Sequence, residues 1–283
     1  MNKIDILEDK EKISQYKNVI KSVVSNSNKI KRVEFFKIFI YLNIISIYFI
    51  LYRINKRINQ KLLNIKNEDD KKTSLINIYP EMAFETIINK YKRKSIIWPL
   101  PNDIKFKPVM LDRELKAFLY FMKPENIYFE FGSGGSTNIA SYFKLKTYSV
   151  ESDLKWHQKL KNNGIIANYI TIDLNNSDLG YPGINTNIND WKKYIQAYKK
   201  EYNADVILID GRFRVACALD IFPKIRNDTI IFFHDYINRP QYHIIEKFYI
   251  KIKSWDTLTL FIKNPFINSI PLKIYNFYLK VKN

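Results

Sequence analysis

The sequence predicts a doubly wound α/β fold: a mostly parallel sheet with helices on both faces, preceded by an N-terminal helical region. Three observations predict it. From residue 127 onward, short apolar runs alternate with stretches that carry charges at helical spacing. A glycine-rich turn follows the first run directly, and every run ends in an acidic residue or within one residue of one. Apolar runs joined by crossover helices are typical of a parallel sheet with both faces covered.

The apolar runs predict five strands in chain order. They are IYFEF (127–131), TYSVE (147–151), NYITID (168–173), DVILID (205–210) and TIIFFHD (229–235). Helices fill the gaps, and the apolar stretch VACALDIF, which contains Cys217, is predicted to be a core helix. TLTLFIK (257–263) is predicted to be a late strand at an antiparallel edge, and the stretch 174–190 a long loop of the kind that commonly covers an α/β site.

Composition divides the chain into four parts. We expect a helical region over 1–75, a linker and pre-domain segment over 76–104, the α/β domain over 105–263, and a basic tail over 264–283. Residues 35–52 include IFIYLNIISIYFILY, which carries no charge, approaches the length of a spanning helix and is flanked by Lys and Arg. These features predict a membrane-associated protein with a single N-terminal anchor and its α/β domain in the cytoplasm. The alternative is a soluble cytoplasmic protein in which this helix is buried against the domain or a partner.

The charge and the cysteine content restrict the function classes. The formal net charge is +18, but Lys, Ile and Asn are favoured throughout, as an AT-rich genome would produce. This favours a lysine-coated soluble surface, and the alternative is a dedicated surface for an anion, a nucleic acid or a membrane. The chain has no recognisable basic recognition helix, zinc-ligand spacing or RNA-binding aromatic motif, which makes nucleic-acid binding the least favoured class. One cysteine excludes an internal disulfide.

The glycines of EFGSGGST (130–137) lie where the first strand turns into its helix. A ligand approaches the main chain closely at this point of a doubly wound sheet, and a Cβ would block either the approach or the turn. The spacing is not the G-x-G-x-x-G of nicotinamide enzymes, because Thr137 stands in the third glycine's place. A tight turn with a purely structural role is the alternative.

Acidic residues end the later strands along one expected edge. Glu151 ends the second strand about twenty residues after the glycines, where an acid binds ribose hydroxyls in nucleotide-binding halves of this kind. Asp173 and Asp210 close the third and fourth strands, and His234 with Asp235 closes the fifth. Ligands bind at this edge of open α/β sheets.

Taken together, these residues resemble the Rossmann-like class I S-adenosylmethionine-dependent methyltransferases. The branch they most resemble has an Asp-Gly pair after strand four, here Asp210 and Gly211, and a His-Asp pair after strand five. The resemblance covers about residues 105–263. The last glycine of the family's first motif is replaced by Ser136.

The resemblance implies S-adenosylmethionine as the cofactor and assigns roles to particular residues. Glu151 would hold the ribose of the cofactor. The pocket for its methionine part would be shaped by Glu130, Gly132, Ser133, Gly134 and Gly135. Asp173 would lie near the adenine. Trp156 would lie near the adenine too, although a core tryptophan is the simpler interpretation.

Methyl transfer to a hydroxyl needs alignment and removal of a proton. Asp210, His234 and Asp235 are the candidate catalytic residues. In one version His234 or Asp210 is the general base; in the other, Asp210 and Asp235 hold Mg²⁺, as in some relatives of the branch. A strand-end histidine satisfied by the backbone is the alternative for His234.

Three arginines lie near the expected mouth of the site: Arg212, Arg214 and Arg239. An arginine fork there could bind a carboxylate or phosphate on the acceptor. The alternative for Arg212 and Arg214 is that they pair with the edge acids.

The leading hypothesis is therefore a methyltransferase acting on a small or sugar-like hydroxyl acceptor, such as part of a glycan. The alternative is a membrane-associated binding or scaffold protein whose methyltransferase-like domain is not catalytic.

Overall fold

The computed structural model describes residues 89–175 and 180–281. The predicted helical region, the anchor at 35–52 and the boundary near residue 75 lie outside the described residues. Within the described ranges, no helix is both long and apolar enough to cross a bilayer.

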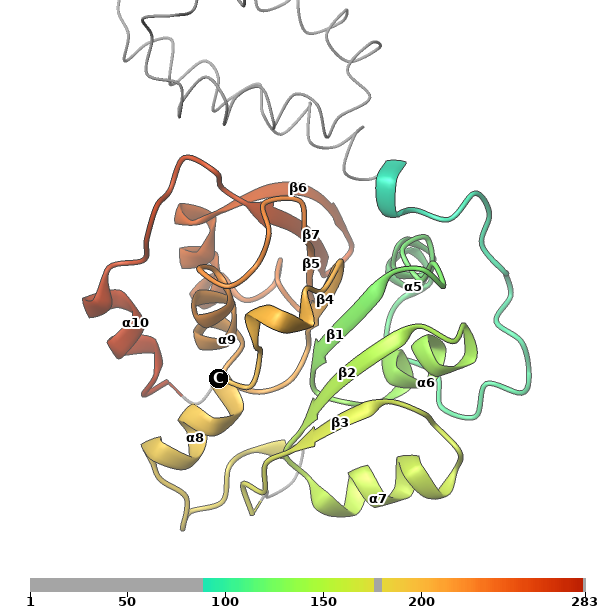
Figure 1. Ribbon diagram of the computed structural model, residues 1–283, viewed down its shortest axis with the longest axis horizontal. Helices are drawn as coiled ribbons and strands as arrows, with labels where there is room; N and C mark the ends of the chain where they lie inside the picture. The colour runs from blue at the N-terminus through green and yellow to red at the C-terminus, as the bar shows by residue number, and fades with distance from the viewer. Residues whose placement is uncertain (1–88, 176–179, 282–283) are drawn as a thin grey trace, which may run out of the picture. The chain divides into compact units, whose positions relative to one another are not determined.

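Seven strands of the described chain form one sheet, in the order β3-β2-β1-β4-β5-β7-β6 (Figure 1). Their bounds are β1 Ile127–Phe131, β2 Lys146–Glu151, β3 Asn168–Thr171, β4 Val206–Ile209, β5 Ile230–Phe233, β6 Tyr249–Trp255 and β7 Leu258–Lys263. The first five strands pair in parallel, and β7 pairs antiparallel with both β5 and β6. The predicted fold class is confirmed.

The late strand is antiparallel as predicted, but its predicted place at the edge is wrong. β7 lies inside the sheet between β5 and β6, and all but one of its residues are buried. β6 forms the edge, and its partly exposed side chains fit that place. Its alternation of Ile250, Lys251, Ile252 and Lys253 is the pattern of a half-exposed strand.

Helices cover both faces of the sheet. Their bounds are α5 Asp112–Leu119, α6 Gly135–Tyr142, α7 Leu154–Asn162, α8 Ile188–Ile195, α9 Arg214–Ile221 and α10 Leu272–Tyr278, with 3₁₀ helices at Lys200–Tyr202 and Pro240–Lys247. Figure 1 shows α5, α6 and α7 on one side of the sheet and α8, α9 and α10 on the other. Because α8 begins at Ile188, the loop predicted over 174–190 ends earlier than expected.

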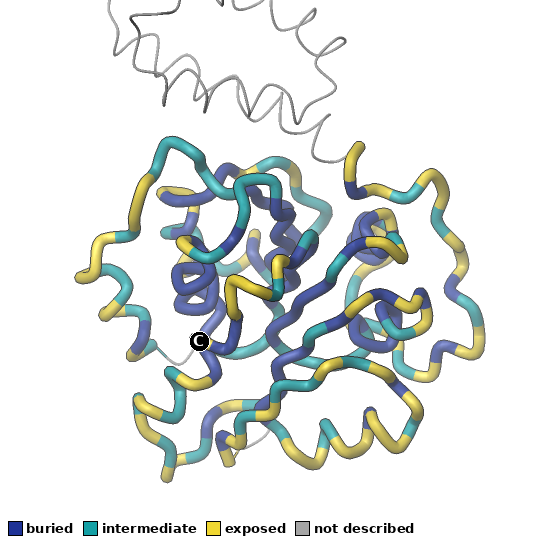
Figure 2. The backbone as a smooth tube through the Cα atoms, in the orientation of Figure 1, coloured by how far each residue is buried: buried dark blue, intermediate teal, exposed yellow. Residues whose placement is uncertain are grey.

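The core lies around β1, β4 and β5, whose residues are almost all buried (Figure 2). Helix α9 is buried along its whole length, and Cys217 is fully buried, so its predicted core position is confirmed. Helix α10 packs against α9 and falls within the basic C-terminal tail.

The strand register brings the predicted site residues to one edge. Phe131 at the end of β1 is in register with Val150 of β2 and Ile209 of β4, and Ile209 is in register with Phe233 of β5. The residues that follow these positions leave the sheet at the same level, as expected of parallel strands. The glycine turn, Glu151, Asp210 and the His234–Asp235 pair therefore share one side of the sheet.

Candidate active site

The three glycines after β1 are needed for different structural reasons. A Cβ on Gly132, whose φ is +93°, would lie 2.8 Å from Cα of Gly211, and one on Gly135 would lie 2.2 Å from the backbone nitrogen of Pro108. Both contacts are with main chain, which cannot rotate away. A Cβ on Gly134 would meet nothing within 4 Å. Two glycines are thus required by packing, and only Gly134 presents bare backbone to open space.

Glu130 is fully buried beneath the glycine turn. Its carboxylate accepts hydrogen bonds from four hydroxyls: Tyr128 at 2.7 Å, Ser136 at 2.6 Å, Ser149 at 2.7 Å, and Thr137. Burial raises the pKa of Glu130 to about 7, against the lowering effect of these hydroxyls. Glu130 therefore organises the turn from below and does not face a ligand. Ser136, which replaces the family's last glycine, is one of its donors.

Glu151 at the end of β2 is held by backbone and by the glycine turn. One carboxylate oxygen accepts the amides of Ser152 at 2.7 Å and Asp153 at 2.8 Å. The other accepts the amide of Ser133 at 3.1 Å and its hydroxyl. Burial raises the pKa of Glu151, and these hydrogen bonds oppose the rise. The structure thus brings Glu151 and Ser133 together, and their roles toward the cofactor stay predictions.

Trp156 braces the same turn. Helix α7 starts at an Asp153 cap, whose side chain accepts the amides of Lys155 and Trp156. The indole N–H of Trp156 then donates to the carbonyl of Ser133 at 3.0 Å, and its ring packs edge-on against Phe106. Trp156 is partly buried, so it is not the core tryptophan of the simpler interpretation, and its place near the adenine stays a prediction.

Asp173 is not drawn into the cluster. It is exposed after β3, and its hydrogen bond is a local one from the amide of Asn175 at 2.8 Å. The role near the adenine stays a prediction.

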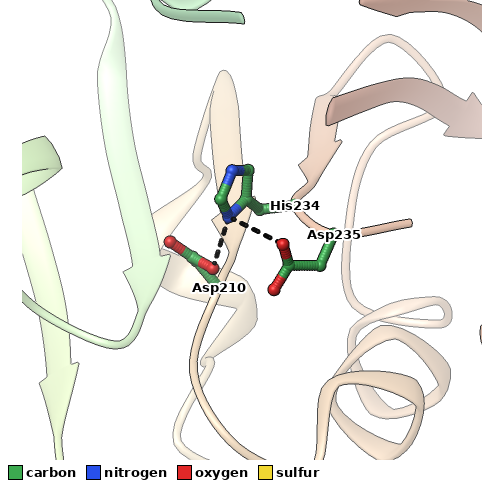
Figure 3. A group of neighbouring side chains, drawn as sticks. All are labelled: Asp210, His234 and Asp235. Atoms are coloured by element: carbon green, nitrogen blue, oxygen red, sulfur yellow. Dashed lines mark hydrogen bonds and ion pairs between the residues drawn. The ribbon is translucent and has the colours of Figure 1, made fainter. Parts of the chain in front are cut away.

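The structure brings Asp210, His234 and Asp235 together at the ends of β4 and β5 (Figure 3). The Nδ1 atom of His234 lies 3.0 Å from Oδ1 of Asp210 and 3.9 Å from Oδ1 of Asp235. The two carboxylates are partly exposed, whereas the His234 side chain is buried. These three residues could offer ligand atoms to a metal ion.

Glu114 of α5 completes this cluster, and sequence reasoning missed it. One of its oxygens lies 3.5 Å from Nε2 of His234, and its carboxylate also accepts the amides of Leu111, Thr257 and Leu258. Burial alone would raise the pKa of Glu114, but the hydrogen bond from Thr257 and the backbone amides leave it below its ordinary value. A lone acid on an amphipathic helix carries no sequence signal for the contact with His234, because His234 lies more than a hundred residues away.

His234 is clamped between carboxylates. Burial by itself lowers the pKa of His234, but the hydrogen bond with Asp210 and the charges of Asp210, Asp235 and Glu114 raise it overall. Burial would raise the pKa of Asp210, yet the hydrogen bond from His234 and the charge of Arg214 hold it below its ordinary value. Both ring nitrogens of His234 face oxygens that only accept, which favours the protonated imidazolium. This arrangement speaks against His234 as general base and leaves the two aspartates for that role.

Arg214 is buried between the two aspartates. Its Nη2 lies 3.2 Å from Oδ1 of Asp210, and its Nη1 lies 3.2 Å from Oδ2 of Asp235. Arg239 also pairs with Asp235, at 3.0 Å. Pairing with the edge acids, the alternative interpretation of Arg214, therefore describes the contacts of both arginines.

Arg212 is placed differently. Its guanidinium carbon lies 3.7 Å from the ring centre of Tyr181, so the described part of the loop after β3 reaches the exit of β4. Of the three predicted acceptor-binding arginines, it is the one stacked on an aromatic ring from that loop.

The donor set does not fit Mg²⁺ well. Two aspartates carry two negative charges, and Arg214 and Arg239, which contact them, carry two positive charges. Mg²⁺ takes oxygen ligands and favours carboxylates whose charge is available. The charge is already compensated here, and the third candidate ligand is an imidazole.

Comparison with known proteins agrees with this architecture. No family model matches the sequence, and no curated protein matches it. Among solved structures, the chain is similar to a methyltransferase-like protein from Silicibacter pomeroyi, with 26% identity and a TM-score of 0.55 over 62% of this chain and 98% of that one. A second similar structure is an S-adenosylmethionine-dependent methyltransferase from Clostridium acetobutylicum, with 13% identity over 50% of this chain and 55% of that one; its TM-score of 0.23 supports no conclusion. The described domain therefore has a methyltransferase-like α/β fold.

Proposed function

We propose that this chain is an S-adenosylmethionine-dependent methyltransferase of the class I branch with Asp-Gly after strand four and His-Asp after strand five. The main observation behind this proposal is the Glu151 carboxylate at the end of β2. It accepts a hydrogen bond from the amide of Ser133, which precedes the open backbone of Gly134. That is the place where a doubly wound sheet binds a nucleoside. The likeness to a methyltransferase-like protein supports the same class.

Each half of the edge has its own task in this proposal. S-adenosylmethionine supplies, when bound, a methyl group on a sulfonium that a positioned nucleophile can take. Glu151 holds the ribose hydroxyls, and the turn around Gly134 admits the methionine part without a side chain in the way. Asp210 and Asp235, which are partly exposed, orient the acceptor hydroxyl and receive its proton.

We further propose that the acceptor is a hydroxyl on a small or sugar-like molecule, including a glycan. The partly exposed aspartates support a hydroxyl acceptor, because each can accept a hydrogen bond from it. Membrane association through 35–52, with the α/β domain in the cytoplasm, is part of the same proposal and would place the enzyme beside a membrane-bound glycan.

The competing function is a non-catalytic binding or scaffold protein. The replaced glycine favours it, since Ser136 departs from the family motif. The structure weakens that argument, because the Ser136 hydroxyl donates to buried Glu130 at 2.6 Å and so helps to build the turn.

Calorimetric titration of the full chain with S-adenosylmethionine and S-adenosylhomocysteine tests the cofactor. We expect micromolar binding, lost in Glu151→Ala and weakened at least tenfold in Glu151→Gln. Glu125→Gln, the same change at an exposed carboxylate, is the matched control. Binding that survives unchanged in both Glu151 variants would remove the proposed ribose contact. A folded chain that binds neither molecule would favour the non-catalytic function.

A further inference from the structure

The Arg214 side chain is built into the protein in a way that a surface arginine is not. Its Nε donates to the carbonyl of Gly211 at 2.9 Å, and its Nη1 donates to the carbonyl of His234 at 2.6 Å. Its Nη1 also donates to Asp235, which makes three hydrogen bonds, and its Nη2 forms the ion pair with Asp210. Its side chain is only 8% exposed.

We propose that the Arg214 guanidinium takes the place of a divalent cation between Asp210 and Asp235, so that this edge of the sheet binds no metal ion. The carbonyls of Gly211 and His234 hold the guanidinium between Asp210 and Asp235. One oxygen of each aspartate is already directed at it. The planar fork of arginine can make these contacts at once, whereas a lysine ammonium is a single point charge.

The local chain geometry produces this placement. Phe213, directly before α9, is fully buried and has a left-handed φ of +55°. A bulky residue in this region is uncommon and persists only where the surroundings hold it. The turn makes Arg214 the first residue of α9, so that its side chain returns over Gly211 toward both strand ends.

The neighbouring charges complete the substitution. Arg239 contacts the same oxygen of Asp235 as Arg214 does, at 3.0 Å. His234 contacts Oδ1 of Asp210, the same oxygen that Arg214 contacts. A divalent ion would have to displace fixed positive groups from Oδ1 of Asp210 and Oδ2 of Asp235, and at the other oxygen of either carboxylate it would lie beside the charge of Arg214.

Mn²⁺ binding tests the proposal, because Mn²⁺ uses the same hard oxygen ligands as Mg²⁺ and its free form has an electron paramagnetic resonance signal. The full chain is titrated with Mn²⁺ alone. We expect that the wild type shows no Asp235-dependent binding of Mn²⁺. Arg214→Met should bind Mn²⁺ at least tenfold more tightly than the wild type. Adding Asp235→Asn to Arg214→Met should remove the gain. Arg113→Met, at an exposed arginine paired with Asp256, is the matched control and should bind Mn²⁺ as the wild type does.

Two results would overturn the proposal. One is wild-type Mn²⁺ binding below about 100 µM that Asp235→Asn abolishes; this comparison holds even if Arg214→Met does not fold. The other is a folded Arg214→Met that gains no Mn²⁺ affinity. This proposal rests on the proposed function only because both concern Asp210 and Asp235. The titration uses neither cofactor nor acceptor, so failure to bind S-adenosylmethionine would leave its outcome standing.

Discussion

The wild-type protein should lose stability as the pH rises through neutral, because Glu130 is buried. Replacing Glu130 by glutamine, which cannot ionise, should remove this loss. The pKa of Glu130 rises from 4.5 to about 7 because burial penalises the charged form. The folded state therefore holds this proton between pH 4.5 and 7 after the unfolded chain has released it. Stability from this group is fully present below pH 4.5 and is lost as the pH rises through 7. At about 1.36 kcal/mol per pH unit, the loss is about 3 kcal/mol.

Urea denaturation of the full chain at several pH values between 5 and 8.5 measures this loss. The free energy of unfolding of the wild type, minus that of Glu130→Gln, should fall by about 2.5 kcal/mol across the range, because part of the loss has already occurred at pH 5. Glu125→Gln, at a side chain that is 71% exposed, should show a nearly constant difference. A constant difference for Glu130→Gln as well would refute the reasoning. It would mean that the four hydroxyl donors outweigh burial and keep the carboxylate charged.

Three further predictions concern the turn, the opposite end of the sheet and the acid pair. Gly135→Ala should lower the free energy of unfolding by about 1–3 kcal/mol, because its Cβ would meet fixed backbone. Gly134→Ala should keep that free energy unchanged but weaken S-adenosylmethionine binding at least tenfold. Equal losses of stability in urea for the two variants would contradict this. Arg226→Ala should cost about 2 kcal/mol in the same assay, because Asp205 loses the ion pair at 2.6 Å and Asp228, which keeps Lys90, loses the one at 3.0 Å. A change below about 0.5 kcal/mol, on the order of a surface substitution, would show that these two ion pairs of Arg226 are dispensable. Asp210→Asn should abolish methyl transfer to an acceptor found by screening, and a chelator should leave wild-type transfer intact. Near-full activity of the variant would remove Asp210 from the mechanism.

Strong local patterns made most of the fold predictable. Strand β1 was predicted with its observed bounds, and Glu151, Asp210 and Asp235 lie at the expected edge. Those features depend on apolar runs and their ends, which the sequence displays directly. Strand β6 was missed although its alternation was visible, because its lysines interrupt an apolar run.

The contacts that decide the chemistry were not predictable in the same way. Glu114 reaches His234 from a helix that precedes the first strand, and Arg214 is buried because Phe213 adopts a left-handed conformation. No pattern in one sequence indicates either fact, since both depend on how distant segments pack. The sequence could therefore place arginines near the site but could not separate acceptor binding from pairing with the acids.

The backbone joins the two halves of the site. The amide of Asp210 donates to the carbonyl of Phe131 at 3.1 Å, and the amide of Gly132 donates to the carbonyl of Val150 at 2.9 Å. A Cβ on Gly132 would lie 2.8 Å from Cα of Gly211, and one on Gly211 would lie 3.0 Å from the amide nitrogen of Gly132 and 2.0 Å from the Tyr194 hydroxyl. The turn under the cofactor half therefore cannot shift without moving the strand end that carries Asp210. Substitutions at these glycines should therefore impair cofactor binding and acid placement together. Substitutions at Glu151 remove the hydrogen bonds that hold Ser133, Ser152 and Asp153, so they should impair cofactor binding and the turn but leave Asp210 in place, and this difference separates the two halves of the site.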